Sequence, residues 1–191
     1  FGQVAGFEIP LWYALSGQKP EFKYSFGYQN WYKSAEHETK NTRKNVGFFD
    51  LTPFAKFEIE GEKAFYFLQY LCSNNIKNNP GSITYTQMLN YNAGIVADLS
   101  VTCLSKNKFR IVTGSGVREH DKKHIMKHIY ADLKFKDVTD DYSCFGIFGP
   151  NSRSLLSEIF GNKFENINFP FAQAKSIEMN GISVWFQRLS F

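Results

Sequence analysis

Three short apolar segments lie close together in the middle of the chain, and they limit the fold more than any other feature. They run over residues 83–89, 95–104 and 109–113, with Asn92-Ala-Gly94 and Lys106-Asn-Lys108 as the connections. Asn-Ala-Gly supplies residues that tolerate a positive φ. Short strands joined by such turns indicate an antiparallel meander.

Strand and helix patterns are mixed in the rest of the chain. Residues 54–60 alternate in period two with one largely charged face, which predicts a half-buried strand, and helical spacing follows Gly61 over residues 62–73. Because no regular βαβ alternation is present, we expect an α+β fold with antiparallel sheets and packed helices. The other expected elements are a strand region from Val46, helices over 33–45, 119–130 and 152–159, and strands over 135–138, 144–148, 174–179 and 182–190, the last two joined at Asn180-Gly181.

Both ends of the sequence have a distinctive composition. Residues 1–32 are rich in aromatic and turn-forming residues, which predicts an irregular segment lying against a larger body. The chain begins with Phe1, and its last residues read as an apolar strand cut in mid-course. We therefore expect a piece of a longer protein.

Composition excludes several classes of function. The 191 residues, 43% of them hydrophobic, can bury a sizeable core in one domain or two intimate subdomains. The net charge of +4 is spread along the chain, which predicts no nucleic-acid partner but is compatible with a small anionic ligand. No apolar run approaches the roughly 20 residues that span a bilayer, so no membrane partner is expected.

Cysteines and glycine motifs narrow the chemistry further. Cys72, Cys103 and Cys144 are odd in number and lie in apolar surroundings, which is typical of reduced, buried thiols, and no CxxC pair offers a zinc or redox centre. GxGxxG, GxxxxGKS and GxSxG are all absent. A self-contained nucleotide-binding enzyme is thereby disfavoured.

Asp98 is the leading candidate for chemistry. It stands between Ala97 and Leu99 in an otherwise apolar strand, where an ionised carboxylate is costly unless a partner or ligand compensates it. The alternative is a residue on the outward face of a half-exposed strand, and the pattern alone leaves both open.

The spacing of His120, His124 and His128 places them in one stripe of a helix, and HxxxH can chelate a metal. Lysines surround the stripe and would repel a dication, so a solvated basic face is the preferred interpretation and no metal is predicted.

Three other sites have a functional and a plain interpretation. Ser115 within Thr113-Gly-Ser-Gly116 could be a nucleophile or part of a phosphate loop, but neither motif is complete. A tight turn from a strand into a helix, which can also line a ligand pocket, is the preferred interpretation. Tyr85 and Phe54 could stack on a flat heteroaromatic ligand or fill the core.

Five sequence blocks follow one another along the chain: Asp50-Leu-Thr-Pro-Phe-Ala-Lys-Phe57, Tyr85-Thr-Gln-Met-Leu-Asn90, Ala93-Gly-Ile-Val-Ala-Asp98-Leu, Val112-Thr-Gly-Ser-Gly116 with His120-Asp121, and Gly146-Ile-Phe-Gly-Pro-Asn-Ser-Arg153. In this order they resemble the folate-binding aminomethyltransferase family, to which the glycine cleavage T-protein belongs. Two aromatic segments, Phe7-Glu-Ile-Pro-Leu-Trp-Tyr13 and Phe26-Gly-Tyr-Gln-Asn-Trp-Tyr32, are similar to the segment that precedes the folate domain in dimethylglycine and sarcosine dehydrogenases.

The resemblance implies a domain organisation and a set of site residues. Residues 1–32 would be a linker from a missing upstream FAD-dependent oxidoreductase domain, and residues 33–191 the N-terminal part of a folate-binding domain truncated at its C-terminus. Asp98 would lie near the folate nitrogen that captures the one-carbon unit, as the catalytic residue. Tyr85, Phe54 and Thr113 would line the same pocket.

The implied chemistry joins amine oxidation to one-carbon capture. A methylated amine would be oxidised at FAD in the missing domain, and tetrahydrofolate would capture the product as 5,10-methylenetetrahydrofolate. A carboxylate at Asp98 can stabilise positive charge on the folate nitrogen and assist proton loss. The expected partners are the small-molecule folate and the methylated amine, in the bacterial cytoplasm or, in a eukaryote, the mitochondrial matrix.

Two departures from the family pattern qualify these expectations. The aspartate pair of stand-alone aminomethyltransferases is Ala97-Asp98 here, which favours the dehydrogenase-linked branch. The block that clamps the pterin would begin where the chain stops, so the piece alone is expected to be inactive. A stand-alone aminomethyltransferase or demethylase, and a non-catalytic regulatory subunit, are the alternatives.

Overall fold

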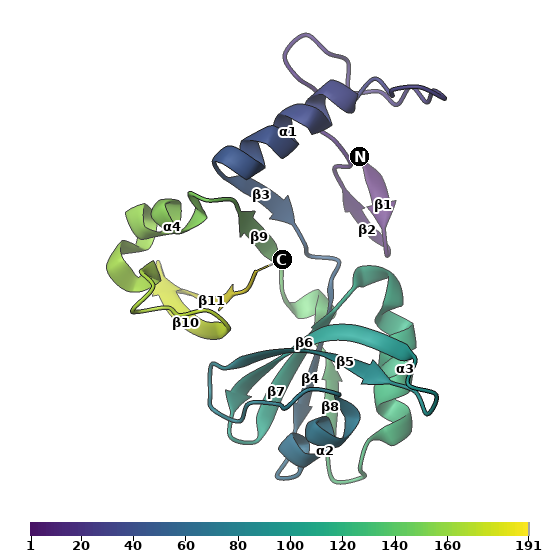
Figure 1. The fold of residues 1–191 in the computed structure, drawn as a ribbon, viewed down its shortest axis with the longest axis vertical. Coiled ribbons are helices and arrows are strands. Elements are labelled where there is room, and N and C mark those ends of the chain that lie inside the picture. The colour runs from purple at the N-terminus through teal and green to yellow at the C-terminus, as the bar shows by residue number, and fades with distance from the viewer. Residues whose placement is uncertain (191) are drawn as a thin grey trace. The chain divides into compact units, whose positions relative to one another are not determined.

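The computed structural model describes residues 1–190, which form two compact units (Figure 1). The first unit comprises Phe1–Pro53 and Cys144–Phe164, and the second comprises residues 54–143 together with residues from Glu165 onward. Each unit draws on two separate stretches of chain. Helices and antiparallel strands are combined without βαβ units, which confirms the α+β prediction.

Small antiparallel strand pairs and helices make up the first unit. β1 (Gly2–Val4) pairs with β2 (Phe7–Ile9), and β3 (Gly47–Asp50) pairs with β9 (Phe145–Phe148). The helices are α1 (Tyr32–Lys44), as predicted over 33–45, and α4 (Ser152–Phe160), which a short 3-10 turn (Gly161–Phe164) follows.

Within the first unit, α1 and the turn after β9 have clear local causes. Lys40 Nζ lies 2.6 Å from Glu36 Oε1 across one turn of α1, which is the expected i,i+4 pairing. Gly149 has a φ of +114°, and a Cβ there would collide with the carbonyl oxygens of Thr42 and Asn45. Only glycine fits where the chain after β9 passes so close to the end of α1.

The β1–β2 hairpin was not predicted, because residues 1–32 read as irregular. Its turn places Ala5 and Gly6 at φ values of 50° and 89°, the left-handed region that two-residue hairpin turns require. Alanine is not a usual residue for that conformation, and strands of three residues carry too little alternation to be recognised.

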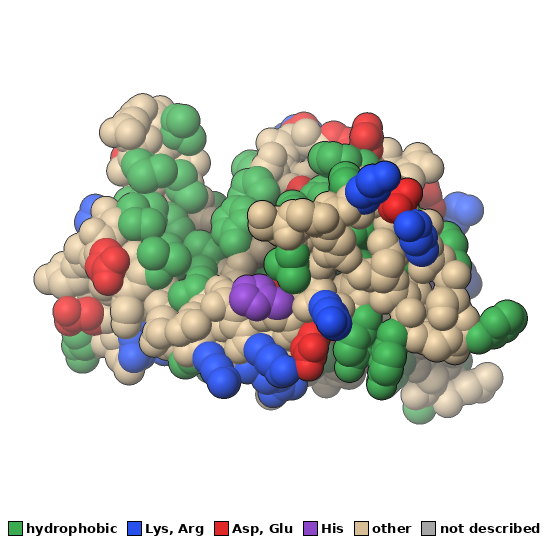
Figure 2. All heavy atoms as spheres, turned by 90° about the horizontal axis from the view of Figure 1, so that it is seen from above, with side chains coloured by type: hydrophobic (Ala, Val, Ile, Leu, Met, Phe, Trp, Pro, Cys, Tyr) green, Lys and Arg blue, Asp and Glu red, His purple; other side chains and the backbone are tan. Residues whose placement is uncertain are grey.

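The rest of this segment agrees with the predicted irregular, aromatic-rich stretch. Trp31 is the centre of a ring cluster, with its ring centroid 5.3 Å from Phe22 and 5.6 Å from Tyr24. Several other aromatic side chains, Phe26 and Tyr28 among them, are exposed. In the space-filling view, hydrophobic side chains are visible at many places on the surface (Figure 2).

A five-stranded antiparallel sheet forms the second unit, in the order β5-β6-β7-β4-β8 (Figure 1). The predicted meander is confirmed as its first three strands. The strand bounds are β5 (Ile83–Leu89), β6 (Ile95–Ser105), β7 (Lys108–Thr113), β4 (Ala55–Glu60) and β8 (Lys134–Asp137).

One face of this sheet packs against α2 (Ala64–Leu71) and α3 (Arg118–His128). Alternate residues of the strands, such as Phe57, Leu99 and Ile111, meet Phe67, Leu68 and Ile125 of the helices, and all are almost completely buried. Burying such side chains stabilises the fold by about 1.5–3 kcal/mol each. Cys72 and Cys103 are buried as expected, whereas Cys144 is half-buried, and all three are free thiols.

The opposite face is polar, yet part of it is buried, so the prediction of a half-buried strand over 54–60 was wrong. Lys56 and Glu58 are only 4% and 7% exposed. Arg110 Nη2 donates to Glu58 Oε1 at 2.6 Å, and Lys108 Nζ lies 2.8 Å from Glu58 Oε2. These ion pairs stabilise the Glu58 carboxylate, while Lys56 Nζ donates to the backbone oxygens of Phe54 and Thr139. Sequence alternation alone does not reveal either kind of pairing.

A second hairpin covers part of this polar face. It consists of β10 (Gln173–Met179) and β11 (Ile182–Arg188), with Asn180 and Gly181 at φ values of 51° and 78°, as the Asn-Gly signal predicted. The ring of Trp185 in β11 lies 5.9 Å from the Arg110 guanidinium, and Gln187 Nε2 donates to Thr102 Oγ1 at 2.9 Å.

None of the helices within residues 1–190 is both long enough and apolar enough to cross a membrane.

We predict that Glu58 makes the protein sensitive to acid. Burial favours the neutral acid, but hydrogen bonds from Lys108 and Arg110 outweigh it and lower the pKa of Glu58 below its ordinary value of 4.5. This stabilisation is complete above pH 4.5 and is lost as the pH falls through the lowered pKa. Urea unfolding between pH 3 and 7 should therefore show a smaller acid-side loss in Glu58→Gln than in the wild type.

Glu60→Gln is the matched control, since Glu60 lies on the same strand but is exposed. An identical acid-side loss in Glu58→Gln and the wild type would contradict the prediction.

Candidate functional site

The pairing of β5 with β6 brings Asp98 beside Tyr85 and Gln87. In this antiparallel register Gln87 is directly opposite Asp98, and Tyr85 is opposite Ser100. Ala97 and Leu99 point into the core under the helices, so Asp98 points to the polar face. The structure thus supports the outward orientation for Asp98, where its carboxylate is exposed.

Both carboxylate oxygens of Asp98 accept hydrogen bonds from β5. Tyr85 Oη donates to Oδ2 at 2.8 Å, and Gln87 Nε2 donates to Oδ1 at 3.3 Å. The Tyr85 side chain is 60% exposed, so its ring is accessible. We refer to Tyr85, Gln87 and Asp98 as the Asp98 cluster.

The hydrogen bond to Asp98 changes the acidity of Tyr85. It raises the pKa of Tyr85 above the ordinary value of 10.0, and partial desolvation and repulsion by the carboxylate add to it. A hydrogen bond from Gln87 acts in the opposite direction. The cluster therefore presents a neutral phenol and a carboxylate side by side.

The turn between β5 and β6 fixes the register that makes this cluster. Asn90 Oδ1 accepts hydrogen bonds from the backbone N–H groups of Asn92 and Gly94, each at 2.9 Å. The residue with positive φ is Ala93, at 60°, whereas the sequence pointed to Asn and Gly. Gly94 is needed for space instead, since a Cβ there would lie 2.9 Å from Asn90 Nδ2.

Thr113 lies in the neighbouring strand but on the helix side of the sheet. It is buried, and its hydroxyl donates to Asp121 Oδ2 at 2.6 Å, while the backbone oxygen of Asp98 is 3.4 Å away. Asp121 is completely buried near the start of α3, with His120 Nδ1 2.9 Å from its Oδ1. In this structure the Thr113 hydroxyl links the end of β7 to the start of α3 by a hydrogen bond. Its predicted place in the lining of a folate pocket stays a prediction.

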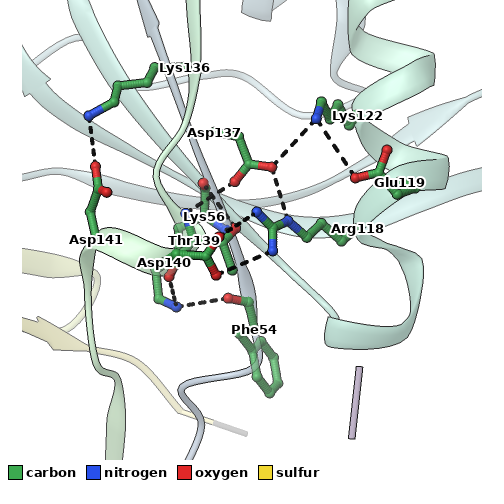
Figure 3. Close-up of polar contacts among 10 residues, drawn as sticks. All are labelled: Phe54, Lys56, Arg118, Glu119, Lys122, Lys136, Asp137, Thr139, Asp140 and Asp141. Atoms are coloured by element: carbon green, nitrogen blue, oxygen red, sulfur yellow. Dashed lines mark hydrogen bonds and ion pairs between the residues drawn. The ribbon is translucent and has the colours of Figure 1, made fainter. Parts of the chain in front are cut away.

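Phe54 precedes β4 and is half-buried. Its carbonyl oxygen accepts a hydrogen bond from Lys56 Nζ at 2.8 Å, and its ring points away from the polar contacts around Lys56 (Figure 3). Ala55 pairs with Thr113, and Thr113 pairs with Leu99, so Phe54 lies at the same end of the sheet as Asp98. The register brings these predicted positions to one row, with β7 between β4 and β6.

Two residues at this end of the sheet, Gln87 and Asp121, were not among the site residues predicted from the sequence. A signal for Gln87 was present: in a strand, residues two apart share a face, so Gln87 must accompany Tyr85. Asp121 lies in one of the five resembling blocks, but the resemblance assigned it no role, and the local pattern shows only an acid in the first turn of a helix. Its burial depends on the position of β7, which local pattern does not give.

Ser115 lies in a turn as expected, whereas the histidine stripe is less solvated than predicted, since His120 is exposed but His124 and His128 are half-buried. Ser115 opens a 3-10 turn (Ser115–Val117) that leads into α3, which supports the plain interpretation. His124, however, is half-buried, and it lines a surface hollow of about 260 Å³. Burial lowers the pKa of His124, and repulsion from His128 and His120 adds to the effect. Within residues 1–190, no three His, Cys, Asp or Glu side chains are grouped to hold a metal ion.

Comparison with known proteins gives a consistent family. A family model described as the GCVT N-terminal domain matches residues 1–191. The mitochondrial dimethylglycine dehydrogenase of Rattus norvegicus is 32% identical over 193 residues, which cover 100% of this chain and 22% of the rat protein. A 4-methylaminobutanoate oxidase (formaldehyde-forming) from Paenarthrobacter nicotinovorans is 31% identical over 192 residues, covering 100% of this chain and 23% of the oxidase.

The fold is also found in a solved structure. The crystal structure of the glycine cleavage system aminomethyltransferase T from Bartonella henselae matches with a TM-score of 0.66 and 22% identity, covering 81% of this chain and 43% of that one. At this identity the likeness concerns the fold. The chain spans less than a quarter of the length of the two curated relatives above.

We predict that Asp98→Asn lowers the pKa of Tyr85 toward its ordinary value of 10.0, because the negative charge that opposes phenolate formation is removed. Titration of ¹³C-labelled tyrosine followed by NMR measures this directly. An unchanged Tyr85 curve would mean that the Tyr85–Asp98 hydrogen bond does not form.

Proposed function

We propose, since this chain belongs to the GCVT N-terminal domain family, that it supplies one wall of a tetrahydrofolate site at which a one-carbon unit is captured. The observation that carries the proposal is the Asp98 cluster, an exposed carboxylate with an accessible aromatic ring beside it. A folate presents a flat pterin and amine nitrogens, so a ring for stacking and an anion beside it match its chemistry.

The reaction explains why a carboxylate is useful at this position. A folate amine nitrogen forms a bond to the carbon of formaldehyde, loses a proton, and ring closure at the second nitrogen expels water to give 5,10-methylenetetrahydrofolate. Positive charge develops on nitrogen as the first bond forms. An anion held at Asp98 stabilises that charge and can assist departure of the proton.

A flavin-linked demethylating dehydrogenase is the parent protein that we propose. The relatives named as dimethylglycine dehydrogenase and as a formaldehyde-forming oxidase support it, and both are much longer than this chain. In this scheme an N-methyl amine loses two electrons and a proton to FAD held outside these residues, and water then releases formaldehyde from the resulting iminium. Residues 1–32 would link the flavin part to the folate part, which further chain after residue 190 would complete.

The same family supports a second candidate, aminomethyl transfer without a flavin. The match to the GCVT N-terminal domain is equally compatible with it. A non-catalytic regulatory subunit would not need the Asp98 carboxylate, so the Asp98 cluster argues against that alternative. The proposed partners are the folate and a methylated amine, in the bacterial cytoplasm or, in a eukaryote, the mitochondrial matrix.

We predict that the natural protein containing these residues binds tetrahydrofolate in a calorimetric titration. Asp98→Ala should slow methylenetetrahydrofolate formation by roughly a hundred-fold, the scale of a lost proton-transfer or charge-stabilising group. Tyr85→Ala should weaken folate binding by about ten-fold, since a stacking surface is lost. Rates are followed with formaldehyde as the one-carbon donor.

Asp132→Asn is the control, because Asp132 is an exposed acid with a single salt bridge to Lys63. The folate proposal fails if wild-type protein shows no heat of binding, or if Asp98→Ala and Asp132→Asn give the same rate.

A further inference from the structure

Gln87 is the member of the Asp98 cluster to which the family resemblance assigned no role. Its amide nitrogen lies 3.3 Å from Asp98 Oδ1, from the position directly opposite in the antiparallel register. Directly opposite residues are the closest side-chain neighbours across two strands. The contact is therefore a consequence of the β5–β6 register.

The geometry around Asp98 shows what Gln87 adds to Tyr85. An exposed carboxylate that accepts one hydrogen bond can still turn about its Cβ–Cγ bond. Tyr85 holds Oδ2 and Gln87 holds Oδ1, so two donors from residues on one strand fix the plane of the carboxylate. Because each oxygen has further lone-pair capacity, a ligand N–H can still bind the fixed anion.

The side chain of Gln87 is also less exposed to solvent than that of Tyr85. It is half-buried, whereas Tyr85 is 60% exposed, so Gln87 competes less with water for its partner. Its amide interacts with Tyr85 as well, since a hydrogen bond from Gln87 lowers the pKa of the Tyr85 phenol. One amide group thus connects the phenol with the carboxylate.

The structure assigns to Gln87 the role of a positioning residue, which sets the orientation of the Asp98 carboxylate toward the reacting nitrogen of a folate-type amine. This inference rests on the proposed function. It predicts that loss of the amide affects the rate of one-carbon capture more than it affects folate affinity, because Gln87 acts through Asp98 and not on the ligand.

The test compares two identical substitutions, one in the five-stranded sheet and one in the β10–β11 hairpin that covers part of its polar face. Gln87→Met keeps the length of the side chain and removes its donors. Gln187→Met does the same to an amide that donates to Thr102 on this face. The first readout needs no folate: in ¹³C-tyrosine NMR, Gln87→Met should raise the pKa of Tyr85 further, and Gln187→Met should leave the Tyr85 curve unchanged.

The second readout is catalysis with formaldehyde and tetrahydrofolate in the natural protein. Gln87→Met should lower kcat by roughly ten-fold with less than about a two-fold change in the KM for tetrahydrofolate, since misoriented groups cost rate. Gln87→Glu should lower kcat more, because it places a second negative charge opposite Asp98.

The outcomes separate the two proposals. If the wild type neither binds nor converts tetrahydrofolate, the proposed function fails, while the Tyr85 titration still decides whether Gln87 contacts the cluster. An unchanged kcat in Gln87→Met would overturn the positioning role. So would an equal loss of kcat in Gln87→Met and Gln187→Met, since that result indicates a general effect on the sheet.

Discussion

The register of β5 against β6 is the constraint on which the candidate site depends. Side chains in a strand alternate between two faces, so a slip of one residue would bury Asp98 among the helices and expose Ala97. Two features hold the register: the apolar residues that must meet the helix side, and the Asn90 side chain that closes the turn. The chemistry on one face of the sheet is therefore fixed by hydrophobic packing on the other.

Elsewhere on the polar face of the same sheet, an ion pair stabilises charged side chains that are nearly buried. Glu58 and Arg110 are nearly buried, and each would be costly there without the other. Arg110 also lies under the ring of Tyr142, 4.3 Å from its centroid, so the ion pair joins the sheet to the loop that follows β8. The exposed Asp98 cluster and this buried pair occupy one face, but only the buried pair is under strong constraint from folding.

Periodicity and turn signals predicted most of the fold. The meander, the helices after β4 and β7 and the Asn180-Gly181 hairpin follow from local sequence rules, and the α+β class follows from their order. The burial of Lys56 and Glu58 could not be predicted, because the strand pattern does not show that Thr139 contacts Lys56 or that Arg110 pairs with Glu58. Ala5 and Ala93 adopt left-handed conformations, which an alanine in the sequence does not predict.

The candidate site was predictable to a similar extent. The block resemblance pointed to Asp98 and Tyr85, and the structure places them in one hydrogen-bonded cluster. The contact of Gln87 with Asp98 depends on the β5–β6 register, and the burial of Asp121 depends on the packing of α3 on β7, so local sequence predicts neither. A residue that acts only by orienting a neighbouring side chain belongs to no motif of its own. It is identified only when the three-dimensional structure shows which side chains it contacts.

The solvent exposure of Asp98 has a consequence for substitutions at this position. An aspartate on the open side of a sheet contributes little to the free energy of unfolding, so its replacement leaves the scaffold intact. Thr113 and Asp121, in contrast, are buried and bonded to each other, and their loss would damage the scaffold first. A substitution at Asp98 can therefore change the proposed site and leave the architecture intact, at a smaller cost in the free energy of unfolding than a substitution at Thr113 or Asp121.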